Sequence, residues 1–267
     1  MKFKIDHDLH IHSHLSFCAD GDMRENKYTI LKYAEDNGLK TVCVTDHYWD
    51  SAVAGASDWY KGQNFEHISE IKPLPQIEGI KFLFGCEAEL DRFLTLSIPK
   101  ERFDDFDFII IPTTHMHMGG FVVNGDEDAK QRAVLWKDRF NAVLDMDLPF
   151  GKVGIAHLTC ELMYQKEPNG YLAVVNNISD GEYAEIFKKA ADKGVGIELN
   201  FNSLSMNDDE FNQNLRPFKI AKQQGCKFYF GSDSHHPETL EKAMANFTKI
   251  ADALDLEESD KFIIKGI

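Results

Sequence analysis

Seven short hydrophobic stretches recur along the chain and are separated by longer, more polar segments. Most are nearly continuous runs rich in β-branched and aromatic residues, which is typical of strands buried on both faces of a parallel sheet. They occupy residues 5–12, 41–47, 80–90, 106–115, 152–159, 195–202 and 227–235.

Amphipathic segments with helical periodicity fill several of the gaps between these stretches. The first is expected to begin at a capping box formed by Asp22 and Glu25 and to end before Gly38. Strands that alternate with helices favour a right-handed βα architecture. The segments 55–78 and 160–180 are expected to be long loops over one face, with short helices in places. The five helices are predicted near 24–37, 129–144, 181–193, 208–224 and 238–253.

Length and composition indicate the number of domains and the cellular environment of the protein. A chain of 267 residues can form one sizeable core, and no linker divides it, so we expect a single domain over 1–267. The N-terminal stretch MKFKIDHDLH is too polar for a signal peptide, and no hydrophobic run reaches membrane-spanning length. Five scattered cysteines without a CxxC pair indicate reduced thiols in a cytoplasmic protein.

The formal net charge of −15 argues against nucleic acid as a partner, because an acidic surface repels a phosphodiester backbone. No basic stripe interrupts this acidic balance. A small phosphorylated metabolite is a more compatible ligand, provided that a concentrated positive charge is present at its binding site.

Six of the seven predicted strands end on residue types that bind metal ions. In a βα barrel the C-terminal strand ends meet at one face, so these side chains should point into one bowl. The sixth strand ends instead on Asn200 and Asn202, which are weak ligands. The residues concerned are His10, His12, His47, Glu87, His115, His157, Asp233 and His235.

The spacing within the strands supports the same interpretation. His10 and His12 lie two residues apart and therefore face the same side of a strand. Imidazole and carboxylate ligands suit zinc, manganese or iron better than calcium. Eight such groups exceed what one ion needs, so we expect two or three divalent ions, with Glu87 as the bridging ligand.

An isolated histidine at a strand end is more often an ordinary polar residue than a ligand. We therefore leave outside the site the five other histidines that the pattern does not require: His7, His14, His67, His117 and His236. The HxH pair or the SDSH run alone would be a moderate signal. Ligand types at the same end of six strands are what make a purely structural explanation untenable.

Six motifs, in this order along the chain, resemble the PHP superfamily, which is named after polymerase and histidinol phosphatase. They are DLHIHS at 8–13, TDH at 45–47, GCEAE at 85–89, TTH at 113–115, AH at 156–157 and GSDSH at 231–235. The resemblance implies a distorted seven-stranded (β/α)7 TIM-like barrel with a trinuclear metal centre. It also implies a metal-dependent phosphoesterase similar to free-standing histidinol phosphatases.

The resemblance further implies how the ligands are shared among three ions. His10, His12, Glu87 and Asp233 would hold the first, His47 and His235 the second, and Glu87, His115 and His157 the third. The family places another histidine or aspartate shortly after the HxH pair. We assign this position to Asp20, with Cys18 as the alternative.

The expected reaction is hydrolysis of a small phosphomonoester by a metal-activated water. We assign catalytic roles to four of the predicted ligands, and histidinol phosphate is the leading substrate by resemblance. Arg24, Arg92 and Arg216 are candidates for binding phosphate, whereas Asp46 could be either catalytic or structural. Two alternatives remain: a 3′–5′ exonuclease or phosphodiesterase acting on nucleic acid, and a non-catalytic metal-binding domain. The four residues are His10, Glu87, Asp233 and His235.

Overall fold

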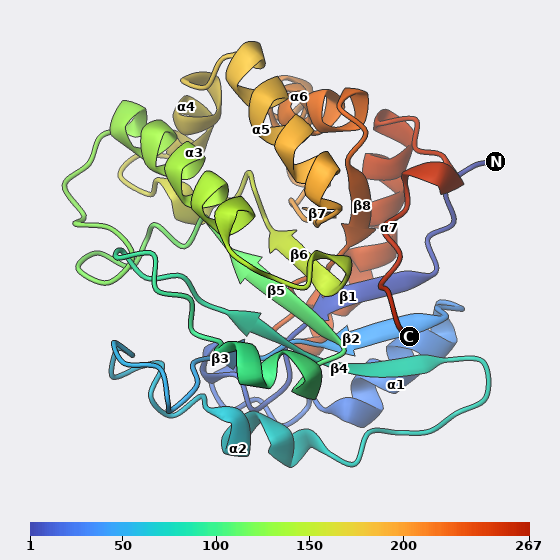
Figure 1. Ribbon diagram of the computed structural model, residues 1–267. Helices are drawn as coiled ribbons and strands as arrows, with labels where there is room; N and C mark the ends of the chain where they lie inside the picture. The colour runs from blue at the N-terminus through green and yellow to red at the C-terminus, as the bar shows by residue number, and fades with distance from the viewer.

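A computed structural model describes residues 1–267 and shows a nearly closed barrel of parallel strands with helices between them (Figure 1). The strands follow one another around the barrel in the order β1-β2-β4-β5-β6-β7-β8, and the short β3 pairs with β4. The strands are β1 (His7–Ile11), β2 (Thr41–Val44), β3 (His47–Tyr48), β4 (Lys81–Ala88), β5 (Phe108–Pro112), β6 (Val153–Ala156), β7 (Gly196–Leu199) and β8 (Lys227–Phe230). The predicted seven-stranded fold class is confirmed.

The second predicted strand is divided in the structure. Its residues form β2 and β3, because the intervening Thr45 and Asp46 leave the β2–β4 ladder. The Thr45 N–H donates to the carbonyl of Ile11 on β1 at 2.8 Å, next to the Ile11–Val44 pair. The Asp46 carboxylate accepts from the Ser13 N–H at 2.6 Å and from its hydroxyl at 2.7 Å, which gives Asp46 the structural role.

All five predicted helices are present, and their ends lie within about three residues of those expected. Between β4 and β5 the chain forms no α-helix, only the 3₁₀ helix Lys100–Asp105. The loops predicted at 55–78 and 160–180 contain the short α2 and α4. The helices are α1 (Lys27–Asp36), α2 (Phe65–Ile68), α3 (Ala129–Asp145), α4 (Gly170–Asn176), α5 (Asp180–Lys193), α6 (Asp208–Gln223) and α7 (Pro237–Ala253).

The start of α1 differs from the prediction. The helix is capped by Asn26, whose side chain accepts from the N–H groups of Tyr28 and Thr29, so the capping box predicted from Asp22 and Glu25 is wrong. Glu25 is fully buried, and its carboxylate accepts from the Ser234 hydroxyl at 3.2 Å. The predicted stop is correct, since Gly38 follows the helix with a φ of 66°.

Side chains alternate between the inside and the outside of the barrel, as the two-residue period of a strand requires. On β5, Ile109 and Ile111 join the large outer core beneath the helices, whereas Phe108 and Ile110 join a separate inner cluster. Phe262, from the C-terminal tail, belongs to the same inner cluster. The barrel interior is therefore packed with side chains at one end, which leaves the carboxyl end of the strands for chemistry.

The seam between β1 and β8 is closed just beyond the end of β8. The Asp233 N–H donates to the His10 carbonyl at 2.8 Å, and the His12 N–H donates to the Ser234 carbonyl at 2.9 Å. Lower in the seam, the Phe230 N–H donates to His7 Nε2 at 3.1 Å. Burial lowers the pKa of His7, which keeps that nitrogen available as an acceptor. His7 is thus a structural residue, as expected.

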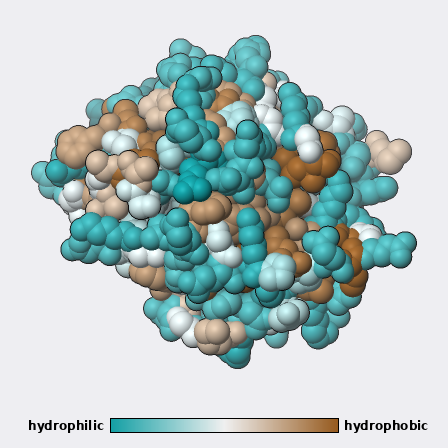
Figure 2. Space-filling model, turned by 60° about the horizontal axis from the view of Figure 1, so that its bottom comes forward, coloured by the Kyte–Doolittle hydropathy of each residue, from teal (hydrophilic) through white to brown (hydrophobic).

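The surface is consistent with the acidic, polar composition. Figure 2 shows the lower part of the view in Figure 1, where hydrophilic residues cover most of the face and hydrophobic residues form small patches. None of the helices has both the length and the hydrophobicity needed to span a bilayer.

Candidate metal centre

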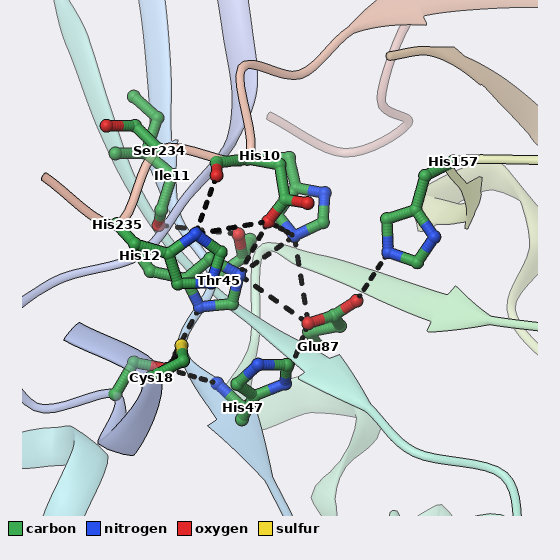
Figure 3. Close-up of polar contacts among 12 residues, drawn as sticks. His10, Ile11, His12, Cys18, Thr45, His47, Glu87, His157, Ser234 and His235 are labelled. Atoms are coloured by element: carbon green, nitrogen blue, oxygen red, sulfur yellow. Dashed lines mark hydrogen bonds and ion pairs between the residues drawn. The ribbon is translucent and has the colours of Figure 1, made fainter. Parts of the chain in front are cut away.

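Eight of the nine predicted ligands lie together at the carboxyl ends of the strands. They come from β1, β3, β4 and the segments that follow β1, β5, β6 and β8, and their ligand atoms lie close together. Figure 3 shows the side chains of His10, His12, His47, Glu87, His157 and His235 pointing toward one another. Most are almost fully buried, whereas Asp233 and His235 keep about a quarter of their side chains exposed, 25% and 27% respectively. The eight are His10, His12, His47, Glu87, His115, His157, Asp233 and His235.

Glu87 lies in the middle of the histidines, and its two oxygens face different rings. Oε2 lies 2.8 Å from His47 Nδ1 and 3.5 Å from His12 Nε2. Oε1 lies 3.1 Å from His157 Nε2 and 3.6 Å from His115 Nε2. A carboxylate in this position can bind two ions at once, one on each oxygen.

A second group forms beside it around the HxH pair. His12 Nε2 lies 3.1 Å from His10 Nε2 and 3.1 Å from Asp233 Oδ1. His10 Nε2 lies 3.5 Å from the same carboxylate oxygen. The three ligand atoms therefore converge on one point, which is the arrangement expected for a shared cation.

The unsatisfied atoms of the cluster fit a bound cation. His47 Nδ1 and Glu87 Oε2 are both buried, and neither makes a hydrogen bond although they lie 2.8 Å apart. The His10 ring meets Glu198 through Nδ1, so a proton held there leaves the lone pair of Nε2 facing the centre. Buried polar atoms without partners are costly, and a divalent ion would satisfy these atoms.

The electrostatics of the cluster also favour metal binding. Burial alone would raise the pKa of Glu87, but His47, His115 and His10 outweigh it and hold that pKa well below its usual range. Burial has the same raising effect on Asp233, where His10 and His12 again bring the pKa well below the usual range. Both carboxylates are therefore ionised and ready to bind cations.

Two ligand-type residues have strained backbones. His157 has a φ of 29° and Asp233 a φ of 52°, in the left-handed region that non-glycine residues rarely adopt. Such a conformation costs of order 1–3 kcal/mol and persists only where the surrounding structure imposes it. Strain at two positions of one cluster is typical of a functional site.

The sequence analysis missed two buried carboxylates that orient the histidines. Glu198 on β7 accepts from His10 Nδ1 and from the His157 N–H, both at 2.7 Å. Glu89 accepts from His115 Nδ1 at 2.7 Å and from the Tyr60 hydroxyl at 2.7 Å. Carboxylates of this kind fix the tautomer of a ligand histidine. The signal for Glu89 was its position two residues after Glu87, on the same face of the strand.

Two cavities adjoin the cluster, and both contact Asp233 and Leu162. The larger, of about 610 Å³, is lined by residues of the 160–171 segment and by Asn200 and Asn202. The smaller, of about 490 Å³, is lined by Trp59, Tyr60 and the imidazole rings of several cluster histidines. The two predicted loops therefore do wall the bowl. Neither cavity is lined by a lysine or an arginine.

Comparison with known proteins supports the interpretation of this geometry. The family model of the PHP domain matches residues 8–202 of this chain. The chain belongs to the PHP family. The matched segment ends before Asp233 and His235, so the structure rather than the family match places these two residues in the cluster of this PHP protein.

Individual proteins of similar sequence or structure agree with this family assignment. A protein of Caldicellulosiruptor bescii named "Probable phosphatase" is 22% identical over 233 residues, which cover 85% of this chain and 80% of that protein. The crystal structure of histidinol phosphate phosphatase from Lactococcus lactis, complexed with zinc, L-histidinol and phosphate, matches with a TM-score of 0.53 and 18% identity. That match covers 92% of this chain and 94% of the other.

A Listeria monocytogenes protein with a provisional histidinol phosphatase name matches with a TM-score of 0.62 and 15% identity, over 90% of this chain and 99% of that one. At these identities the structural matches establish the shared barrel. Family membership and the buried ligand cluster together identify this PHP protein as a hydrolase of the phosphatase type.

Asp20 is the one predicted ligand that the structure does not bring into the cluster. It is exposed and has a left-handed backbone with a φ of 49°. Cys18 lies in the cluster instead, within one ligand group with His12, His47 and His235. Burial alone would raise the pKa of the Cys18 thiol, but His47 and His235 outweigh it and lower the pKa to about 7.

None of the three candidate arginines reaches the centre. Arg24 is paired with Asp22 and Glu238 on the surface, and Arg216 is held by Asp180 and by backbone carbonyls beside α5. Arg92 stacks on the exposed ring of Phe93. Because they line neither cavity, they give no support to an arginine clamp for phosphate.

Proposed function

We propose that this PHP protein hydrolyses a small phosphomonoester at a centre of two or three divalent ions, with zinc, manganese or iron as candidates. The observation that carries the proposal is the buried cluster of histidines and carboxylates at the floor of two compact cavities. No lysine or arginine lines these cavities, so bound ions would supply the concentrated positive charge that an anionic substrate needs.

The proposed ligand assignment follows the three groups of converging atoms. His10, His12 and Asp233 form one, Glu87, His115 and His157 form another, and His47 and His235 belong to the third. The position of Glu87 between the groups supports a bridging role and a trinuclear centre.

Bound divalent ions would supply Lewis acidity toward the phosphoryl oxygens and an activated water as the nucleophile. The side chains of the protein would orient the ligands and contact the substrate. Glu198 and Glu89 hold His10 and His115 in the orientation that presents Nε2 to the centre. Asp233 and His235 are the most exposed members of the cluster and both line the smaller cavity, so they are placed to contact the substrate. His10 and Glu87 lie deeper and would act as ligands.

Two buried neutral groups in the larger cavity are suited to an oxygen-rich ligand. Thr159 Oγ1 and Asn200 Nδ2 are buried and have no hydrogen-bond partner. Both residues line the larger cavity next to His157 and Asp233. A phosphate or hydroxyl group of the substrate would satisfy them, which compensates in part for the missing arginine.

Histidinol phosphate is the first named substrate to test. The larger cavity contains the acidic Glu161 and Glu210, whose charge suits a substrate with an amino group. The Lactococcus lactis neighbour was crystallised with L-histidinol and phosphate. The size of the cavities and the acidic surface argue against a polynucleotide, which must place many phosphates along the protein.

The test compares hydrolysis of histidinol phosphate and p-nitrophenyl phosphate with cleavage of a single-stranded oligonucleotide by metal-loaded protein. The expected result is turnover of a monoester that a strong chelator abolishes and that is lost in His10→Ala. The matched control is His236→Gln, which changes a neighbouring histidine outside the ligand groups. Faster turnover of the oligonucleotide would favour the nuclease alternative, and no turnover of any phosphoester would favour the binding-domain alternative.

A further inference from the structure

The short 3₁₀ turn Phe17–Ala19 carries a thiol into the metal cluster. Cys18 Sγ lies in one group with ligand nitrogens of His12, His47 and His235, and these four atoms are all within 4.8 Å of one another. Figure 3 shows the sulfur pointing toward the rings of His47 and His235. Three imidazole nitrogens and one sulfur are a ligand set that suits a tetrahedral ion.

The backbone of this turn fixes which residue points inward. The Ser16 N–H donates to the Ser13 carbonyl at 3.0 Å, and the Ala19 N–H donates to the Ser16 carbonyl at 2.9 Å. The Phe17 N–H is held by Gln63 Oε1 at 2.9 Å. Because the chain then turns left-handed at Asp20, that carboxylate is directed to solvent while Cys18 remains inside.

The other four cysteines are not in a comparable position. Cys43, Cys86 and Cys226 are buried and belong to no ligand group. Cys160 Sγ lies 3.8 Å from His157 Nδ1, on the side of that ring opposite to Nε2, which faces Glu87. Cys18 is therefore the only thiol that shares a group with the proposed ligands.

We propose that Cys18 binds a metal ion as a thiolate, together with His47 and His235, in the position where the family uses a carboxylate or a histidine. Thiolate is a soft ligand that selects zinc or iron(II) over manganese and magnesium. One position of the centre would thus be selective for a thiophilic ion. The inference rests on the proposed metal centre but not on the identity of the substrate.

Ser16 is placed to support the thiolate. Its Oγ lies 3.3 Å from Cys18 Sγ and 3.0 Å from His12 Nδ1, and it accepts from the His47 N–H at 3.3 Å. The hydroxyl has one proton to donate, and a thiolate without its own proton can accept it. Ser16 therefore contacts three members of one group and would orient them as a set.

Cobalt(II) substitution tests the ligand directly, because thiolate ligation gives an intense near-ultraviolet charge-transfer band that nitrogen and oxygen ligands do not give. The cobalt-loaded wild type should show the band. Cys18→Ser and Cys18→Asp should lose it, and the matched control Cys160→Ser should keep it. Cys18→Asp restores a carboxylate, so it should bind the full number of ions with a preference shifted from zinc toward manganese in a competition measured by elemental analysis.

The outcomes separate this inference from the proposed function. A cobalt-loaded wild type with full metal content and no thiolate band would overturn the role of Cys18 and leave the metal centre standing. A band that persists in both Cys18 variants, or that disappears in Cys160→Ser, would also overturn it. Zinc K-edge absorption of the unmodified protein gives a check without any variant, since a zinc–sulfur distance of about 2.3 Å is required.

Discussion

Replacing Glu198 with glutamine tests whether the metal centre depends on residues that hold its histidines in place. The carboxylate is fully buried and uses one oxygen for His10 Nδ1 and the other for the His157 N–H, each at 2.7 Å. Glutamine keeps the size of the side chain but has one acceptor oxygen and one NH₂ donor. It can therefore satisfy only one of the two contacts.

Either orientation of the glutamine amide has a defined cost. If the NH₂ group faces His10, the ring must carry its proton on Nε2, which removes the lone pair from the metal centre. If it faces the His157 N–H, two donors meet and a buried N–H loses its partner, at about 1–3 kcal/mol. Loss of such a supporting contact typically weakens metal affinity 10–100-fold, which is about 1.4–2.8 kcal/mol.

The assay is competition for zinc between the protein and a chromophoric chelator, with wild type and Glu198→Gln compared at the same pH. The matched control is Glu182→Gln on α5, whose carboxylate also accepts two hydrogen bonds, both of them from Ser179, but is partly exposed and remote from the cluster. The control should lose helix stability without losing zinc affinity.

Unchanged zinc affinity in Glu198→Gln, in protein that remains folded by circular dichroism, would refute the reasoning. It would mean that His10 does not rely on its Nδ1 partner to present Nε2. Nitrogen NMR of the His10 ring would distinguish the two orientations, because only the first changes the tautomer.

Three further predictions concern the same region. Glu87→Gln should release more than one ion per chain, and full occupancy by elemental analysis would contradict its bridging role. Gly231→Ala should destabilise the apo protein and lower its zinc affinity, because the new Cβ would lie 2.1 Å from Glu198 Oε1 and 2.5 Å from His10 Cβ; thermal unfolding and chelator competition check this. Burial raises the pKa of Glu25 from 4.5 to about 7, so its charged form destabilises the fold increasingly as pH rises between these values. The stability advantage of E25Q over wild type, measured by chemical denaturation, should therefore grow by about 2–3 kcal/mol between about pH 5 and about pH 8.5.

The barrel and most of the cluster could be predicted because both follow from local patterns. Continuous hydrophobic runs indicate buried parallel strands, and the ends of such strands must meet at one face. His10 and His12, two residues apart, and Glu87 at the end of the longest strand carry this information in their positions. No long-range knowledge is needed beyond the rule that strand ends converge.

The supporting residues could not be predicted because their partners come from remote parts of the chain. Glu198 and His10 are 188 residues apart, and they meet only because β7 lies near the closed seam of the barrel. Glu25 follows the pattern of a capping box, yet tertiary contact with Ser234 draws it inward and leaves capping to Asn26. A buried partner prevailed over a local preference worth about 1 kcal/mol.

The choice between Asp20 and Cys18 shows the same limit on a smaller scale. Residue chemistry favours the carboxylate of Asp20 as ligand, whereas the usual spacing from the HxH pair is closer to that of Cys18. The outcome depends on the sign of one dihedral angle, because the left-handed φ of Asp20 turns the chain outward. Under the proposed ligation by Cys18, this single turn would decide whether the centre has an oxygen or a sulfur ligand.

The absence of lysine and arginine from the two cavities links the electrostatics of the chain to its proposed chemistry. The protein carries a net charge of −15, and neither cavity is lined by a lysine or an arginine, so without bound ions the cavities present no permanently charged cation to a phosphate ester. An arginine clamp would bind the anion whether or not ions were present. Here the affinity for the substrate would instead depend on the bound ions. Thr159 and Asn200 would orient the substrate through hydrogen bonds but would contribute no charge. Substrate binding and metal loading would therefore be coupled, and both would depend on the carboxylates that hold the histidines in place.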